Sequence, residues 1–142
     1  TGAEIHHGGD RAFYSPSTDT IHVPHRTSFK PEGYFETLFH ELAHWTEHSG
    51  RTNWDRSKPE NTYAAGELRA ELAACYLSNE LGLPCQQRED NHAAYLAHWL
   101  GAMRQDSSFI FRITAHASKA ADFVLAPGRE CSSLTEQEAV AT

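Results

Sequence analysis

Residues 40–44 read His-Glu-Leu-Ala-His, an H-E-x-x-H pattern, and this pattern constrains the chain most strongly. Residues at positions i and i+4 share one face of an α-helix, so His40 and His44 can reach a single ion while the helix keeps its backbone hydrogen bonds. Glu41, beside the first histidine, can then act as general base toward a water on that ion. The pattern is typical of zinc hydrolases. It predicts a helix with a metal site built on it.

A helix over residues 33–48 would carry the pattern. At about 100° per residue, its bulky apolar side chains fall on one broad face and its histidines on the other. The apolar face comprises Phe35, Leu38, Phe39, Leu42, Trp45 and Thr46, and the polar face comprises His40, Glu41, His44 and His48. The alternative is an ordinary amphipathic helix with two solvated histidines. Because the helix is rich in bulky apolar residues, we expect both faces to be covered, and a covered histidine pair needs partners such as a metal ion.

A catalytic zinc site usually has three protein ligands, so a third ligand must come from elsewhere in the chain. A second helix is predicted over residues 63–81, because Asn61-Thr62 can cap its start and Gly82 and Pro84 stop it. This helix carries Glu67 and Glu71, again four residues apart on one face. Either acid qualifies as the third ligand. Two solvated helix glutamates are the alternative.

The remaining segments predict a small amount of sheet and two further helices. Residues 12–14 and 21–23 flank a turn-rich linker, which indicates a β-hairpin, and Pro24 ends the second strand or marks it as an edge. The unpaired backbone of an edge strand before the metal helix could bind an extended peptide; the alternative is a hairpin that only roofs the core. Residues 1–11 are expected to be a loop. Helices are predicted over residues 91–105 and from about 109 to 125.

Length and charge limit the classes of protein to which the chain can belong. The chain of 142 residues is long enough for one domain with its own core, which we place at residues 1–126, followed by a disordered tail at 127–142. The formal net charge of −7 argues against nucleic-acid binding by this segment, because phosphate contact needs clustered Lys and Arg. No apolar run approaches membrane length and no signal peptide is visible, so no membrane partner is expected. Since the chain begins at Thr1 without a methionine, we expect an excised domain that lacks an amino-terminal portion.

Three cysteines, Cys75, Cys85 and Cys131, are an odd number without C-x-x-C spacing. This argues against a disulfide framework and against a cysteine zinc site. We expect free thiols in a reducing cytoplasm.

Ordered motifs along the chain resemble one known domain. The motifs are Gly8-Gly9-Asp10-Arg11-Ala12-Phe13-Tyr14-Ser15-Pro16, Asp19-Thr20-Ile21-His22-Val23-Pro24, His40-Glu41-Leu42-Ala43-His44-Trp45-Thr46 and Tyr63-Ala64-Ala65-Gly66-Glu67-Leu68-Arg69-Ala70-Glu71-Leu72. The chain is similar to the zincin-like metallopeptidase domain of ArdC-type antirestriction proteins and related plasmid primase accessory proteins. The resemblance extends to about Leu125 and implies a zincin-like α+β fold, mainly helical with a short β-hairpin or small sheet.

The resemblance also implies roles for the two acids of the second helix. In zincins with a glutamate as third ligand, the first acid of the E-x-x-x-D/E element binds zinc and the second orients a ligand histidine. Glu67 is therefore expected to be the ligand, and Glu71 the orienting residue or the alternative ligand. Gly66 departs from the family pattern, because relatives often carry a glutamate there. One Zn²⁺ is expected, although two histidines and a carboxylate also accept Mn²⁺ or another divalent metal.

The expected activity is hydrolysis of peptide bonds in a protein substrate that the sequence does not identify. Zinc held by His40, His44 and Glu67 would activate a water, and Glu41 would take its proton and return it to the leaving amine. His48 and Tyr63 are the candidates for stabilising the oxyanion. The alternative is a catalytically silent zinc-binding module that shields incoming DNA or binds a host protein. The resemblance implies a bacterial mobile element, with single-stranded DNA bound only through an amino-terminal module outside this sequence.

Overall fold

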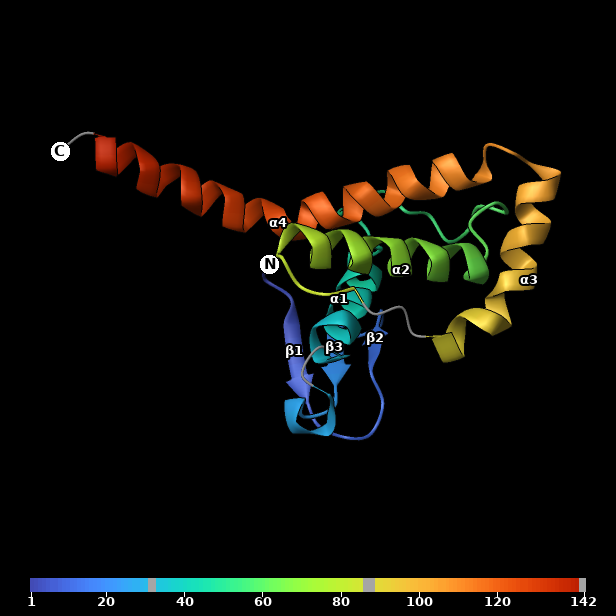
Figure 1. Ribbon diagram of the computed structural model, residues 1–142, viewed down its shortest axis with the longest axis horizontal. Helices are drawn as coiled ribbons and strands as arrows, with labels where there is room; N and C mark the ends of the chain where they lie inside the picture. The colour runs from blue at the N-terminus through green and yellow to red at the C-terminus, as the bar shows by residue number, and fades with distance from the viewer. Residues whose placement is uncertain (31–32, 86–88, 141–142) are drawn as a thin grey trace.

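A small three-stranded sheet lies against a mainly helical body in the computed structural model (Figure 1). The elements in chain order are β1 (Glu4–His7), β2 (Phe13–Ser15), β3 (Thr20–Val23), a 3₁₀ turn η1 (Arg26–Ser28), α1 (Gly33–Trp45), α2 (Tyr63–Glu80), α3 (Glu89–Gln105) and α4 (Phe109–Val140). The structure describes the backbone of residues 1–30, 33–85 and 89–140, and the side chains of 1–30, 33–85 and 95–129. The fold is α+β and mainly helical, as predicted.

The sheet has the strand order β1-β3-β2, in which β3 runs parallel to β1 and antiparallel to β2. The predicted hairpin is confirmed as β2 and β3. The prediction of a loop over residues 1–11 was wrong, because β1 pairs along its whole length with β3, from Glu4 opposite Thr20 to His7 opposite Val23. Because Ile5 is its only aliphatic residue, β1 has too little alternation of apolar and polar residues to predict a strand. It forms a strand through its pairing with β3.

The position of β3 changes the edge-strand prediction. Ile21 and Val23 of β3 are fully buried in the middle of the sheet, and Pro24 follows the strand directly. Pro24 therefore ends the strand and does not mark an edge. The edge strand on the side of the hairpin is β2, which also contacts α1.

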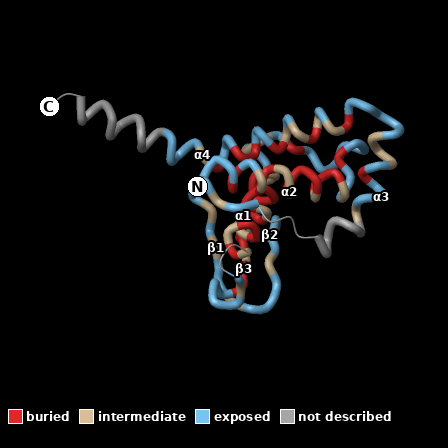
Figure 2. Tube along the Cα trace, in the orientation of Figure 1, coloured by how far each residue is buried: buried red, intermediate tan, exposed pale blue. Residues whose placement is uncertain are grey.

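The core forms around α1, which packs against the inner face of the sheet and also against α2 and α4 (Figure 2). Its largest cluster contains Ile21, Val23, Tyr34, Phe39, Leu42, Trp45, Ala74, Leu77, Ala121 and Val124. A second cluster consists only of buried alanines, namely Ala43, Ala70, Ala73, Ala117 and Ala120. Because alanine side chains are small, α1, α2 and α4 approach closely there. This close approach brings the acids of α2 to the histidines of α1.

The metal helix is one turn shorter than predicted, since α1 ends at Trp45 and not at His48. The carbonyl groups at the end of α1 accept hydrogen bonds from side chains, where a longer helix would supply backbone N–H groups. Thr46 Oγ1 and Arg69 Nη1 donate to Ala43 O at 2.6 and 3.0 Å, and Arg51 Nη1 donates to Trp45 O at 2.7 Å. The backbone tightens into i→i+3 bonds, such as Glu47 N to His44 O at 2.9 Å. His48 therefore leaves the helical face on which the sequence placed it.

The prediction that the last helix ends before Pro127 was also wrong. The structure continues α4 through Pro127 to Val140, and residues 141–142 of the segment expected as a tail lie outside the described part. Arg129, two residues after the proline, makes two ion pairs at the surface. Arg129 Nη1 donates to Asp122 Oδ1 at 3.0 Å and Arg129 Nη2 donates to Glu80 Oε1 at 3.1 Å.

The free-thiol prediction was wrong for two of the three cysteines. Cys75 on α2 forms a disulfide with Cys85 in the segment after that helix, and their Cα atoms are 5.5 Å apart. The chain reverses at Gly82, which has a positive φ of 66°, so Cys85 returns to the helix. The side chain of Cys131 lies outside the described residues. Within the described part of the chain, no helix is long and apolar enough to cross a membrane.

Candidate metal centre

Three side chains from α1 and α2 converge on one point. His40 Nε2 and His44 Nε2 lie 3.1 Å apart on α1. The carboxylate of Glu67 on α2 faces both, with Oε2 3.5 Å from His40 Nε2 and Oε1 3.4 Å from His44 Nε2. Among the described residues, these three form the group whose ligand atoms could hold a metal ion, all within 4.8 Å of one another.

The spacing of these atoms fits a small divalent cation. A tetrahedral ion with bonds of roughly 2.0–2.1 Å places its ligand atoms about 3.3 Å apart. The distances of 3.1, 3.4 and 3.5 Å bracket that value. Two imidazoles and one carboxylate are also ligand types that zinc, manganese and related metals accept. The residues present therefore fit a metal with three protein ligands.

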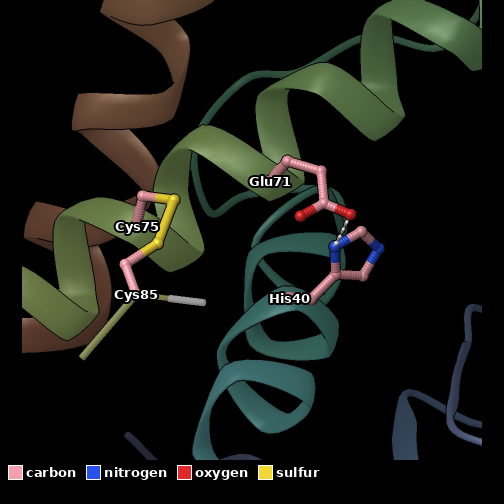
Figure 3. The surroundings of a disulfide bond; sticks show 4 residues. All are labelled: His40, Glu71, Cys75 and Cys85. Carbon is pink, nitrogen blue, oxygen red and sulfur yellow. Dashed lines mark ion pairs between the residues drawn. A yellow bond between two sulfur atoms is a disulfide. The ribbon is translucent and has the colours of Figure 1, made fainter. Parts of the chain in front are cut away.

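The outward nitrogen of each histidine faces a further carboxylate. His40 Nδ1 lies 3.3 Å from Glu71 Oε1 (Figure 3), and His44 Nδ1 lies 2.9 Å from Glu47 Oε1. A carboxylate on Nδ1 fixes the ring orientation and presents Nε2 as the donor to a metal. Glu71 thus lies where an orienting residue is expected, and Glu67 lies where a ligand is expected.

Glu47 is a site residue that the sequence analysis missed. Its carboxylate is almost fully buried, with the side chain 3% exposed, and it pairs with Arg69 Nη1 at 3.4 Å and with Arg56 Nε. Arg69 is itself fully buried. A Cβ at Gly66 would lie 3.9 Å from Glu47 Oε1, so α2 presents bare backbone to this carboxylate. The shortened end of α1 brings Glu47 back to His44, and no motif in the sequence signals that.

The acids and histidines stabilise each other's charged forms. Burial lowers the pKa of His40, but the hydrogen bonds to Glu67 and Glu71 outweigh it and raise that pKa to about 10. Burial likewise opposes ionisation of Glu67, yet the two histidines hold its pKa well below the ordinary range. The carboxylates of Glu47, Glu67 and Glu71 therefore favour positive charge at this point, which either protons on the two imidazoles or a bound cation can supply.

Glu41 lies beside the centre without joining it. Its side chain is buried, and burial raises the pKa of the carboxyl. Its carboxylate accepts a hydrogen bond from the backbone N–H of Tyr14 on β2. A buried carboxylate with a raised pKa beside a metal site can accept a proton from water and release it again.

An open cavity of about 630 Å³ gives access to the centre. It is lined by Asp10, Arg11, Ala12, Phe13, Tyr14, Pro16, His40, Glu41, His44, Arg56, Tyr63, Glu67, Glu71 and Tyr95. Tyr63, a predicted oxyanion stabiliser, lies on this wall, and hydrogen bonds to Tyr95 and Glu67 raise the pKa of its phenol. His48 is not part of the wall, and its Nδ1 lies 3.1 Å from Ser49 O. The structure also brings Arg56 to the cavity, which sequence spacing did not indicate.

Comparison with curated proteins finds relatives of this chain in bacteria. It is 43% identical over 145 aligned residues to the protein named DNA primase TraC of Escherichia coli, an alignment that covers 99% of this chain and 14% of that protein. It is 35% identical over 126 residues to the uncharacterised protein y4eC of Sinorhizobium fredii, covering 87% of this chain and 41% of that protein. The chain thus spans less than half the length of either relative.

Solved structures of one protein share the fold. The metal-free antirestriction protein ArdC of plasmid R388 matches with a TM-score of 0.75 and 39% identity, over 86% of this chain and 45% of that one. Its Mn(II)-bound form matches with a TM-score of 0.76 and 38% identity, over 88% and 48%. The family described as zincin-like metallopeptidase matches residues 1–116. The chain therefore belongs to the zincin-like metallopeptidase family.

Proposed function

We propose that this chain is the zinc-dependent peptidase domain of a mobile-element antirestriction protein and that it hydrolyses peptide bonds in a protein substrate. One observation carries the proposal. Glu41 lies buried between the ligand histidine His40 and the edge strand β2, and it opens onto the same cavity as the metal ligands. A purely structural metal site has no need of such an acid.

In the proposed hydrolysis, each residue of the site has a separate role. A divalent ion bound by His40, His44 and Glu67 would supply Lewis acidity, activating a water and polarising the scissile carbonyl. Glu41 accepts the proton of the attacking water at its carboxylate and delivers it to the nitrogen of the leaving amine. The Tyr14 N–H favours the ionised form of that carboxylate. The Tyr63 phenol donates to the oxyanion as the carbonyl carbon becomes tetrahedral.

The edge of β2 is the surface we propose for the polypeptide substrate. Ala12, Phe13 and Tyr14 line the cavity together with the metal ligands. An extended peptide can add to an unpaired strand through main-chain hydrogen bonds, so its scissile bond would lie along β2 and over the metal. This mode of binding is independent of substrate sequence and supports a polypeptide as the substrate class.

The names of the relatives support a proposal for the biological setting of this chain. The names TraC and ArdC describe a DNA primase and an antirestriction protein, and ArdC is encoded by a plasmid. We propose a bacterial, mobile-element setting for the present chain and a location in the cytoplasm. Because this segment carries a net charge of −7, contact with single-stranded DNA would fall to another part of the longer protein.

The test compares the metal-loaded protein with matched variants on a library of bacterial peptides, with new termini read by mass spectrometry and metal content measured in parallel. Glu41→Gln should retain metal and produce no new termini. Glu67→Ala should lose metal and activity together. Glu60→Gln, the same change at an exposed loop position, is the control and should behave as wild type.

Each outcome separates the proposal from the catalytically silent binding module. Cleavage by Glu41→Gln at the wild-type rate would show that the assigned base is wrong. Wild-type protein that holds one metal per chain and cuts nothing would favour the binding module. The metal that co-purifies without supplementation decides between zinc and manganese, the metal bound in one structure of ArdC.

A further inference from the structure

Three rings stand in one row across the outer face of the sheet. His6 on β1, His22 on β3 and Phe13 on β2 are direct cross-strand neighbours. The ring centroids of His6 and His22 lie 5.2 Å apart with planes 19° apart, and those of His22 and Phe13 lie 4.6 Å apart with planes 12° apart. The rings therefore form a continuous stack that runs perpendicular to the strands.

Each of the two histidine rings is hydrogen-bonded to a residue of the neighbouring cross-strand pair, which consists of Glu4 and Thr20. His6 Nε2 lies 2.9 Å from Glu4 Oε1, and His22 Nε2 lies 3.1 Å from Thr20 Oγ1. The opposite face of the sheet carries Ile21 and Val23, which are buried in the core. The strand at the centre of the stack is thus anchored in the core, and both histidine rings have a hydrogen-bond partner on their own strand.

The stack ends at the edge strand that borders the metal cavity. Phe13 is 48% exposed and lines that cavity, and among the described side chains its stacked neighbour is His22 on the inner side. A large apolar ring that is half exposed beside a catalytic centre loses contact with water when a ligand covers it. The outer side of Phe13 is the place where a further ring can be added.

We propose that Phe13 and the two histidines form a subsite for an aromatic side chain, namely Phe, Tyr or Trp, of an extended polypeptide substrate. The inference rests on the proposed binding of substrate along β2. A strand added to a sheet lies about 4.8 Å from its neighbour. This spacing matches the 4.6 and 5.2 Å between the existing rings, so a substrate side chain opposite Phe13 on the outer face continues the stack. The subsite selects the substrate through ring stacking.

The test uses peptides that bind whether or not they are cleaved. A series of alanine-rich hexapeptides, each ending in a hydroxamate that binds the metal, carries one phenylalanine moved along the peptide a residue at a time. A parallel series carries cyclohexylalanine, which has similar size and no aromatic ring. At one position, phenylalanine should bind the metal-loaded protein about fivefold more tightly than alanine and more tightly than cyclohexylalanine.

Substitutions of Phe13 test whether the preference for phenylalanine depends on the stacked rings. Phe13→Leu keeps an apolar side chain and should abolish the preference for phenylalanine, whereas Phe13→Tyr should retain it. Phe111→Leu is the matched control, because Phe111 on α4 is 74% exposed and does not line the cavity. A preference that survives in Phe13→Leu overturns the subsite.

The remaining outcomes distinguish this inference from the proposed function. Equal affinity for every hydroxamate in the series overturns the subsite and leaves the catalytic proposal standing. Failure of every hydroxamate to bind the metal-loaded protein overturns the accessible catalytic centre, and the subsite falls with it.

Discussion

A single carboxylate, Glu47, connects His44 of the candidate metal centre to the buried guanidinium of Arg69 and the half-exposed guanidinium of Arg56. It contacts His44 on one side and the guanidinium groups of Arg56 and Arg69 on the other. Burial opposes its ionisation, but the hydrogen bond to His44 and the two arginines lower the pKa of this carboxyl. Glu47 is therefore ionised and ready to accept a hydrogen bond from His44 Nδ1.

Removal of this carboxylate should weaken metal binding. In Glu47→Ala, the His44 ring loses the partner that fixes its orientation, and we expect affinity for Zn²⁺ to fall by roughly tenfold to a hundredfold. The measurement is competition with a chromophoric chelator, with Glu60→Ala as the exposed control. Unchanged affinity in Glu47→Ala would mean that His44 is oriented by the helix alone.

An ion pair between Arg51 and Asp19 links the hairpin of β2 and β3 to the segment that follows α1. Arg51 donates to both carboxylate oxygens of Asp19 and stacks on Trp45, with its guanidinium carbon 3.7 Å from the ring centroid. Tyr14 also donates to Asp19, at 2.9 Å. Asp19 has a positive φ of 56°, a conformation that Asp and Asn tolerate better than most residues.

This pair predicts acid sensitivity of a defined sign. The hydrogen bonds from Arg51 lower the pKa of Asp19 from 3.8 to about 2. A pKa that is lower in the folded state contributes stability above the unfolded value, and that stability is lost as the pH falls from about 4 toward 2. The stability advantage of wild type over Asp19→Asn, measured by urea unfolding from pH 6 to pH 3, should shrink below about pH 4. A constant advantage would contradict the pairing.

At the scale of elements, patterns within one helix and the local hairpin of β2 and β3 could be predicted, whereas features set by contacts between distant segments could not. The spacing of His40 and His44 is fixed by one helix, and Thr62 caps α2 as predicted by accepting a hydrogen bond from Ala65 N at 3.2 Å. The end of α1 depends on Arg51 and Arg69, which lie outside that helix. Likewise β1 exists because β3 pairs with it.

The disulfide after α2 is another contact that sequence spacing did not reveal. It closes the ten-residue interval from Cys75 to Cys85. We expect the double variant Cys75→Ser, Cys85→Ser to lose about 2.5 kcal/mol of unfolding free energy, because the unfolded chain regains the entropy that the crosslink removed. Urea unfolding measures the loss, and reduction of the wild type should reproduce it. Equal stability with and without reductant would contradict a formed disulfide.

At the scale of the whole molecule, the metal centre joins the two helices that form its structural middle. The candidate ligands His40 and His44 come from α1, the candidate ligand Glu67 comes from α2, and these helices pack closely against each other. The orienting carboxylates are likewise shared between the two, since Glu71 lies on α2 and Glu47 follows α1. Binding of an ion therefore reinforces the pairing on which the fold depends.

Metal should accordingly stabilise the folded chain. A ligand present at a hundred times its dissociation constant adds about 2.7 kcal/mol to the free energy of unfolding. We expect thermal unfolding, followed by circular dichroism, to shift upward with added Zn²⁺ or Mn²⁺ and to return on chelation. Glu67→Ala should show little of this shift. An identical transition with and without metal in the wild type would contradict a site shared by α1 and α2.

The position of the disulfide has a practical consequence in the laboratory. Cys75 lies one helical turn from Glu71, which faces the ligand histidine His40 (Figure 3). Purification buffers often contain thiol reductants and chelators, which open such crosslinks and remove bound metals. Material prepared in that way would differ from oxidised, metal-replete protein at two neighbouring sites on α2. Activities would be comparable only between samples in which both the thiol content and the metal content had been measured.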